Sequence, residues 1–351
     1  MTLQDPMGNR VENGVPDLSA AARRLVAVVV THNRLAQLQK TLARLREAPQ
    51  EDLQAIVVVD NASEDGTRAW LEQQDDPRLA LHLGDVNAGG AGGFATGMRI
   101  AMDRFAPDWL VLMDDDARPH PEALRTFHAA PPGDSCEAVA AAVYFPNGSI
   151  CEMNRPSRNP FWHMREFLRT ARQGRAGFHL KPAHYEADAP LPIDVTSFVG
   201  FFISRRGIER AGYPDPSLFL YADDGIYTLN LRRAGGQILF DPSIRFEHDC
   251  TTFGTAQRGR FRPLWKVYYY HRNLLMLYRL AAGWMFVPVL VVLLPRWLLK
   301  TVDHEGERWR FFGLLLRATR DGVLGRTGVS HDTVLVWAGG ATVSRAKHPA
   351  S

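Results

Sequence analysis

Apolar and polar positions along the first two thirds of the chain form blocks that favour alternating strands and helices. Continuous apolar runs at 25–30, 55–59 and 110–113 are typical of strands buried on both faces, as in a parallel sheet. Leucines spaced three and four residues apart within 35–45 predict an amphipathic helix between the first two runs. The order strand, helix, strand therefore predicts an α/β fold with right-handed crossovers.

Weaker patterns fill the rest of this region. Residues 151–192 are polar and rich in arginine, proline and aromatic residues, and so long an irregular insertion in a compact domain is usually functional or mobile. Elsewhere we expect helices at 67–73, 121–128, 164–172 and 226–233 and one that ends near residue 105, with strands at 79–83, 138–145, 195–204 and 238–240.

The pattern changes after about residue 260, where aromatic and basic residues begin a predicted helix at 265–273. The most apolar stretch, 281–299, is about long enough to cross a bilayer, but Pro288, Pro295 and Arg296 interrupt it. These interruptions favour an interfacial or re-entrant helical hairpin over a true span. The alternative is a buried helical core between the main domain and the C-terminal tail.

These patterns divide the chain into a large domain and a helical appendage. We expect a weakly ordered tail at 1–23, the α/β domain at 24–255, a helical region at 256–343 that includes a helix at 309–320, and a second tail at 344–351.

Composition and charge narrow the classes of function. The chain has 351 residues, 46% of them hydrophobic and 23% charged, which is ordinary for a globular protein. Its net charge of +3 is too small to indicate nucleic-acid binding, but it suits an anionic substrate or membrane surface. Its three cysteines form no CxxC pair and are read as free thiols, and the N-terminus has no signal-peptide apolar core. We therefore expect a cytoplasmic protein.

Three consecutive carboxylates, Asp114, Asp115 and Asp116, follow the apolar run at 110–113. Like charges this close repel one another, and each costs more as water is removed. A hard divalent cation such as Mg²⁺ or Mn²⁺ would neutralise them and join them to a substrate phosphate. A solvated acidic turn is the alternative, but the preceding strand favours a site, because open α/β sheets bind ligands at the carboxyl ends of their strands.

A glycine-rich segment at 87–95 precedes a predicted helix. Gly90, Gly92 and Ala95 fit the dinucleotide-binding spacing G-x-G-x-x-A, but that motif belongs after the first strand, and this one follows the third. We interpret the glycines as allowing a phosphate or sugar to approach the backbone at a helix N-terminus. A purely structural turn explains this segment almost as well.

A second pair of carboxylates, Asp223 and Asp224, precedes the helix expected at 226–233. The N-terminus of a helix favours negative charge, and simple helix capping would account for one of the two. His248 lies downstream, near the end of the domain, where a lone histidine is more often structural than a ligand.

Three motifs, at 28–34, 58–67 and 114–116, together resemble family 2 glycosyltransferases of the GT-A fold, over roughly residues 25–250. Within that family, the segment 87–98, together with the two acidic clusters and the downstream histidine, is similar to bacterial galactofuranosyltransferases of cell-wall synthesis. The resemblance implies a mixed, mostly parallel sheet flanked by helices, with a C-terminal helical extension that associates with the membrane.

The resemblance also implies roles for individual residues. Asp224 would be the general base that deprotonates the acceptor hydroxyl, and Asp223 would orient the acceptor or the base. Asp115 would face the sugar or be solvated. Ile226 is a departure, since related sequences often carry Glu there. Mn²⁺ or Mg²⁺ would be held by Asp114, Asp116 and His248. Thr31 and Asp60 would contact the uridine, and the wider set expected to bind the nucleotide sugar is Thr31, Asn33, Arg34, Asp60, Asn61, Asn87, Gly90, Gly92, Gly93, Asp114 and Asp115.

The implied reaction is metal-dependent transfer of a sugar, best matched by galactofuranose from UDP-galactofuranose, with inversion at the anomeric carbon. A metal would stabilise the diphosphate leaving group, and a carboxylate would activate the acceptor on the opposite face. The implied partners are a polyprenyl-diphosphate-linked glycan and the cytoplasmic face of the plasma membrane, with no nucleic acid; a homo-oligomer stays open.

Three other functions were weighed. A rhamnosyltransferase that uses dTDP-rhamnose shares most of the motifs. A sugar-nucleotide pyrophosphorylase ranks low, because its glycine-rich loop should follow the first strand. A non-catalytic, membrane-associated protein that binds sugar nucleotides comes third.

Overall fold

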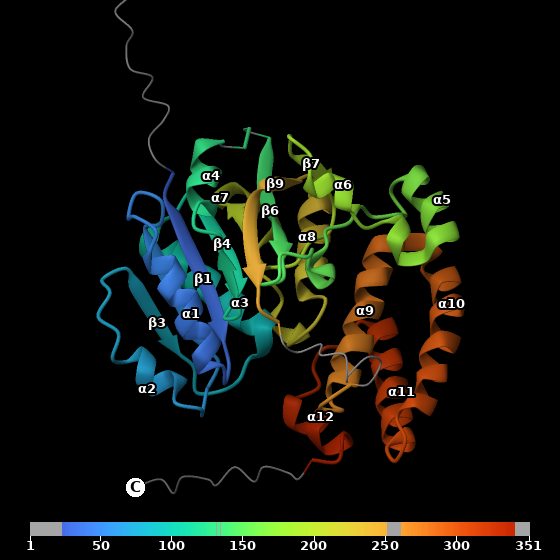
Figure 1. Ribbon diagram of the computed structural model, residues 1–351. Helices are drawn as coiled ribbons and strands as arrows, with labels where there is room; N and C mark the ends of the chain where they lie inside the picture. Colours follow the sequence, from blue (N-terminus) through green and yellow to red (C-terminus); the bar gives the residue numbers. More distant parts are fainter. Residues whose placement is uncertain (1–22, 131, 134, 251–260, 341–351) are drawn as a thin grey trace, which may run out of the picture.

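The computed structural model describes residues 23–130, 132–133, 135–250 and 261–340. One mixed nine-stranded sheet forms the centre of the larger domain, with the order β3-β2-β1-β4-β8-β6-β9-β5 and with β7 paired to β9 (Figure 1). The strands are β1 Leu25–Thr31, β2 Ala55–Asp60, β3 Leu79–Leu83, β4 Trp109–Asp114, β5 Ala117–Pro119, β6 Cys136–Tyr144, β7 Leu191–Ile193, β8 Phe201–Ser204 and β9 Gln237–His248.

Helices cover both faces of this sheet, so the predicted α/β class is confirmed. Leucines of α1 and Phe127 of α4 belong to the core on one face, and apolar residues of α3, α7 and α8 belong to the core on the other. The helices of the domain are α1 Leu35–Arg46, α2 Thr67–Leu71, α3 Gly89–Phe105, α4 Ala123–Ala129, α5 Met164–Gln173, α6 Pro182–Tyr185, α7 Arg205–Ala211 and α8 Asp223–Arg233.

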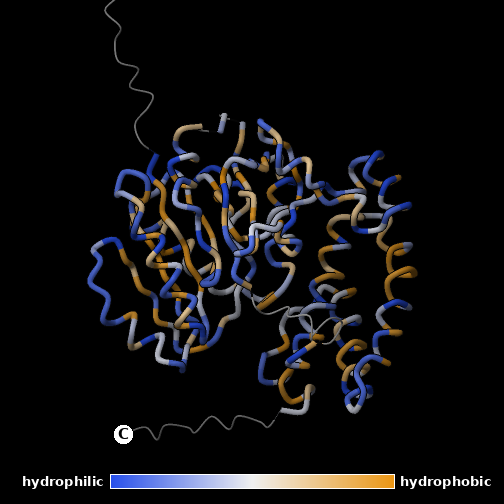
Figure 2. Tube along the Cα trace, in the orientation of Figure 1, coloured by the Kyte–Doolittle hydropathy of each residue, from blue (hydrophilic) through white to orange (hydrophobic). Residues whose placement is uncertain are grey.

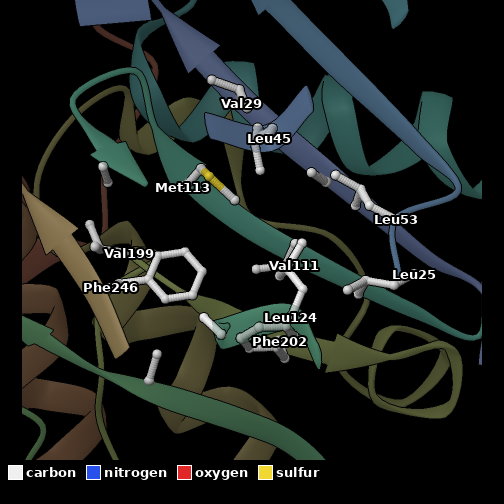
Figure 3. Packing of buried hydrophobic residues seen from close by; sticks show 14 of the residues in the cluster. Leu25, Val29, Leu45, Leu53, Val111, Met113, Leu124, Val199, Phe202 and Phe246 are labelled. Atoms are coloured by element: carbon white, nitrogen blue, oxygen red, sulfur yellow. The ribbon is translucent and has the colours of Figure 1, made fainter. Parts of the chain in front are cut away.

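The central strands are apolar throughout because both of their faces are covered. Every residue of β1 and β2 is buried, as the continuous apolar runs predicted. Figure 3 shows how Val29, Val111 and Met113 of the sheet pack with Leu45 of α1 and with Phe202. Each fully buried side chain of this kind stabilises the fold by about 1.5–3 kcal/mol.

Two strand predictions were wrong in extent. The strand expected at 195–204 forms only at β8, because Gly200 adopts a left-handed φ of +64° and interrupts the extended backbone. A Cβ at Gly200 would lie 2.9 Å from the Cβ of Ala141, so this close approach requires glycine. The strand expected at 238–240 is the much longer β9, which includes His248.

The sheet is also less parallel than expected. Strands β3, β2, β1 and β4 are parallel, but β8 runs antiparallel to both of its neighbours, β4 and β6. Parallel pairing then returns between β6 and β9. The mixed character was predicted correctly, and the predominance of parallel pairs holds only for the half of the sheet that contains β1.

The C-terminal region forms a helical unit with its own apolar cluster, made of α9 Lys266–Ala282, α10 Phe286–Leu299, α11 Arg308–Leu324 and α12 His331–Trp337. By length and composition alone, one helical stretch, Lys266–Asp303, could cross a membrane. It turns at Gly283, where φ is +55°, so α9 and α10 lie side by side as a hairpin (Figure 1). The predicted hairpin is therefore present.

Most of α10 faces outward, which contradicts the alternative of a buried helical core. Val287 and Val291 are 65% and 69% exposed, and only Phe286 and Trp297 of this helix are buried. Figure 2 shows α10 as an apolar segment at the edge of the molecule. The tails predicted at 1–23 and 344–351 and the domain boundary near 255 lie outside the described residues, apart from residue 23.

Candidate functional site

The carboxyl ends of three parallel strands bring the first predicted residues together. In the register of the sheet, Thr31 of β1 pairs with Asp60 of β2, and Val30 pairs with Asp114 of β4. Because these strands run in the same direction, their polar ends lie at one edge of the sheet. The sequence motifs that end the three strands therefore form one region.

Asp115 is buried in this region, so the alternative of a solvated side chain is wrong. It is 4% exposed, and Thr31 Oγ1 donates a hydrogen bond to its Oδ2 at 2.7 Å. Arg34 Nη1 lies 3.5 Å from its Oδ1. Burial raises the pKa of Asp115 to about 7, against the opposing effect of Arg34.

Asp116 and His248 form a buried pair across β9. His248 Nε2 lies 3.0 Å from Asp116 Oδ1, and Arg34 forms an ion pair with the other Asp116 oxygen. Burial opposes ionisation of Asp116, but the hydrogen bond and charge of His248, together with Arg34, lower its pKa below the usual range. Although burial opposes it, the contact with Asp116 raises the pKa of His248 to about 10.

Asn154 fixes the orientation of the His248 ring. Its Oδ1 lies 2.7 Å from His248 Nδ1, and its Nδ2 donates a hydrogen bond to Ser197 Oγ at 2.9 Å. The imidazole therefore turns Nε2 toward the aspartates. A metal-binding histidine has this arrangement, with one nitrogen held by an oxygen acceptor and the other free to face the ion.

Asp114, Asp116 and His248 could hold a metal ion, since their ligand atoms lie within 4.8 Å of one another. Two carboxylates and an imidazole suit Mn²⁺ or Mg²⁺. Burial, and then the charge of Asp116, raise the pKa of Asp114 to about 6, so this cluster lacks sufficient positive charge by itself. The residues therefore fit the divalent cation that the sequence implied.

The second acidic pair lies in the first turn of α8, as predicted. Asp223 is buried, and Asp224 Oδ1 accepts a hydrogen bond from the amide of Gly225 at 2.6 Å. Burial raises the pKa of Asp224 to about 6, and burial with the charge of Asp224 raises that of Asp223 well above its usual value. The charge of Asp114 raises both pKa values, so the two acidic groups share one electrostatic environment.

The glycine segment begins α3, and most of its glycines serve close packing. A Cβ at Gly93 would lie 2.5 Å from Val30 Cγ1, and one at Gly92 would lie 2.6 Å from the Cβ of Ala88. Gly90 is partly exposed and has more room. Packing thus accounts for Gly92 and Gly93, while their predicted contacts with the nucleotide sugar stay predictions.

Polar residues of neighbouring loops connect this helix start to β1 and β2. Asn61 Nδ2 donates a hydrogen bond to the carbonyl of Gly89 at 2.9 Å, and Asn87 Oδ1 accepts one from the Gly89 amide at 2.8 Å. Asn33 Oδ1 accepts from the amide of Glu64 at 2.7 Å. These predicted binding residues therefore order the loops at the strand ends.

Asp60 is fully buried beneath its own loop. Its Oδ1 accepts a hydrogen bond from the amide of Ser63 at 3.2 Å, and Arg68 Nε lies 3.9 Å from Oδ2. A contact with uridine would require that loop to move, and the contact stays a prediction.

The structure adds neighbours that sequence reasoning missed. Asn154 lies in the irregular insertion and carries no recognisable motif. Cys151 and Cys250, interpreted as isolated thiols, lie with His248 in a second group whose ligand atoms are within 4.8 Å of one another. A separation of about a hundred residues along the chain gives no local signal for such a group.

Comparisons with known sequences agree with these motifs. Residues 26–187 match the sequence profile described as Glycosyl transferase family 2. The chain is 28% identical over 240 residues to galactofuranosyltransferase GlfT1 of Mycolicibacterium smegmatis, covering 68% of this chain and 73% of that protein. It is 32% identical over 221 residues to GlfT1 of Mycobacterium tuberculosis H37Rv, covering 60% and 64%. It is also 36% identical over 104 residues to undecaprenyl-phosphate mannosyltransferase of Micrococcus luteus, covering 29% and 41%.

Solved structures share the fold. A mannosyltransferase from Pyrobaculum calidifontis, in complex with GDP-Man and Mn²⁺, superimposes with a TM-score of 0.50 at 19% identity, covering 90% of this chain and 79% of that one. GalNAc-T7 with UDP, GalNAc and Mn²⁺ gives a TM-score of 0.51 at 14% identity, covering 73% and 48%. At these identities the likeness concerns the fold alone.

Proposed function

This chain is a glycosyltransferase that carries a family 2 domain of the GT-A fold, and on that premise we propose that it transfers galactofuranose from UDP-galactofuranose to a hydroxyl of a lipid-linked glycan. The reaction would depend on a divalent cation and invert the anomeric carbon. The product would belong to cell-wall or surface polysaccharide synthesis.

One observation carries the proposal: the site has two acidic ends that suit different tasks. Asp114, Asp116 and His248 form a group able to hold a cation, and Asp223 and Asp224 lie at the start of α8. The charge of Asp114 affects the pKa of both α8 aspartates, which supports a single site with a donor end and an acceptor end.

In this proposal the residues of the chain divide the reaction between them. Asp114, Asp116 and His248 would hold Mn²⁺ or Mg²⁺, which supplies stabilisation of the negative charge that develops on the leaving diphosphate. Asp224 accepts the proton of the acceptor hydroxyl while the hydroxyl oxygen bonds to the anomeric carbon. The bond from that carbon to the diphosphate oxygen breaks on the opposite face, so the configuration inverts.

The choice of sugar and acceptor rests on similarity. The relatives from the two mycobacteria are named galactofuranosyltransferases, which supports UDP-galactofuranose over dTDP-rhamnose as the donor. The relative from Micrococcus is named for an undecaprenyl-phosphate substrate, which supports a polyprenyl-linked acceptor. It also makes mannosyl transfer to a polyprenyl phosphate a second candidate.

A lipid-linked acceptor requires the enzyme to reach the membrane. The exposed apolar face of α10 supports peripheral attachment, which we place at the cytoplasmic face of the plasma membrane. Buried groups elsewhere in the helical unit keep it joined to the catalytic domain, so the attached enzyme would act beside the bilayer.

A transfer assay tests the proposal. Purified protein with Mn²⁺ or Mg²⁺ would be given UDP-galactofuranose, dTDP-rhamnose or GDP-mannose, with a polyprenyl-diphosphate-linked glycan or a polyprenyl phosphate as acceptor. We expect product from UDP-galactofuranose and the linked glycan, and loss of product with EDTA. Transfer from another donor only, or full activity in EDTA, would refute the corresponding part of the proposal.

A further inference from the structure

Loop 216–222, which leads into Asp223 and Asp224, has an unusual backbone. Phe219, Tyr221 and Ala222 have positive φ values of 66°, 71° and 57°. The amide of Leu220 donates to the carbonyl of Leu218 at 2.8 Å across Phe219, whose ψ is −63°, so this residue is at the centre of a γ-turn. Such turns are rare and strained, and they persist only where surrounding contacts hold them.

Two neighbouring side chains of α9 hold this loop. Arg272 Nη2 donates hydrogen bonds to the carbonyls of Ser217 and Leu218, at 3.2 and 2.8 Å. Asn273 Nδ2 lies 2.8–2.9 Å from the carbonyl oxygens of Leu218, Leu220 and Tyr221. Five contacts from two adjacent residues therefore meet one short loop.

Both side chains are fully buried and fixed relative to each other. Arg272 Nε donates a hydrogen bond to Asn273 Oδ1 at 2.7 Å, which turns the Asn273 amide nitrogen toward the loop. The Arg272 guanidinium lies over the rings of Tyr268 and Tyr269, 5.2 and 5.1 Å from their centroids. Among the described residues, Arg272 has no carboxylate partner within ion-pair distance. Burying a charge this way is costly, and here its contacts go to backbone carbonyls.

The same loop contacts the glycine segment on its other side. The Phe219 carbonyl accepts a hydrogen bond from the amide of Ala91 at 3.2 Å, and a Cβ at Gly89 would lie 2.1 Å from that oxygen. The Phe219 ring stacks on Tyr269 and on His331, with centroids 4.7 and 4.4 Å apart. The loop thus lies between the helical unit and the start of α3.

We propose that Arg272 and Asn273 are positioning residues, which hold loop 216–222 in the backbone conformation that presents Asp223 and Asp224 to the acceptor. The inference rests on the proposed function for the role of the two aspartates, but the clamp itself is a property of the fold. It makes the helical unit part of the active-site framework as well as a candidate membrane anchor.

Asn273→Asp in the full-length protein tests this inference. The substitution keeps the size of the side chain and its acceptor for Arg272, but it removes the donor that faces three carbonyls. We expect amide hydrogen exchange in 216–224 to become about tenfold faster. We also expect kcat to fall about 10- to 100-fold, while the affinity for UDP with Mn²⁺ stays within about threefold.

Arg279→Gln is the matched control, since Arg279 also lies on α9 and donates one hydrogen bond to a carbonyl, that of Val323, away from the loop. Wild-type exchange in 216–224 of Asn273→Asp, or an equal change in Arg279→Gln, would overturn the inference. If Asn273→Asp does not fold, Arg272→Lys is judged by the same criteria. A wild-type protein without transferase activity would refute the proposed function, and hydrogen exchange would still decide the clamp.

Discussion

At the scale of single residues, the surroundings of Asp224 suit a proton acceptor. It lies in the first turn of α8, and only its own neighbour Gly225 donates a hydrogen bond to its side chain among the described residues. Burial raises its pKa to about 6, which brings its basicity closer to what a general base needs near neutral pH.

Asp224→Asn should therefore remove turnover and leave the donor end intact. We expect kcat to fall about 10²- to 10⁴-fold, the usual contribution of a general base, with the Kd for UDP and Mn²⁺ within about threefold of wild type. Steady-state kinetics and calorimetric titration measure the two quantities. Asp103→Asn, at an exposed position on α3, is the control. Loss of UDP binding in Asp224→Asn would contradict the assignment.

The raised pKa of Asp224 also predicts how activity depends on pH. Because the carboxylate must be ionised to accept a proton, activity is present above about pH 6 and declines as pH falls through that value, about tenfold per unit. Initial rates at saturating cation, from about pH 5 to about pH 8, would show it, with circular dichroism confirming that the fold persists. A flat profile over this range would exclude Asp224 as the titrating base.

The sequence anticipated which residues end the strands, but not how they are held. Asp114, Asp116 and His248 were predicted to meet, and the structure brings them together. The burial of Asp115 and the orientation of His248 by Asn154 were not predictable. Both depend on side chains from distant segments, whose contacts leave no periodic pattern in the chain.

At the scale of elements, the packing of α3 on β1 depends on missing side chains. A Cβ at Gly97 would lie 2.4 Å from Val28 Cγ1 and 3.1 Å from Val59 Cγ2. These valines belong to fully buried strands and are stiff at χ1, so they cannot move aside easily. The glycine segment is therefore a packing device over most of its length.

Gly97→Ala should destabilise the protein despite the better helix propensity of alanine. Propensity favours alanine by about 1 kcal/mol, but overpacking against β1 costs about 1–3 kcal/mol, so we expect a net loss of about 1–2 kcal/mol. Urea unfolding followed by circular dichroism measures it. Gly328→Ala, where a Cβ meets nothing within 4 Å, is the matched control. Equal stability of the two variants would mean that α3 can shift without cost.

Element boundaries show where sequence patterns stop being informative. The buried strands β1, β2 and β4 were predicted within one residue at each end, since continuous apolar runs with polar ends mark them clearly. The strand at 195–204 was predicted too long, because its apolar residues are buried whether the backbone is extended or not. Hydrophobicity reports burial, and the backbone conformation at Gly200 is decided by its neighbours.

At the scale of the whole molecule, the exposed apolar surface lies on the helical unit. Val287, Val291 and Leu299 of α10 are more than half exposed, as is Trp284 in the preceding turn. A soluble surface rarely gathers apolar side chains in this way, and a membrane interface would cover them. Attachment through this face would leave the sheet edge with its acidic residues outside the bilayer.

The double variant Val287→Asp, Val291→Asp should bind anionic liposomes more weakly. Each buried valine contributes about 1.5 kcal/mol, which corresponds to about tenfold in partitioning, so two substitutions should lower it about 100-fold. Co-sedimentation measures the bound fraction. Val86→Asp is the control, because Val86 is 60% exposed but lies in the catalytic domain. Unchanged sedimentation of the double variant would place the membrane contact elsewhere.

The sequence by itself determined the strand ends, their polar residues and the division into an α/β domain and an apolar helical region. Those features depend on local patterns of burial, which a linear chain displays directly. Only the tertiary structure decided how Asp114, Asp115 and Asp116 divide their contacts, and that α9 holds the loop before Asp223 and Asp224. Hydrogen bonds between residues far apart in the chain set both, and their geometry exists only once the elements have packed.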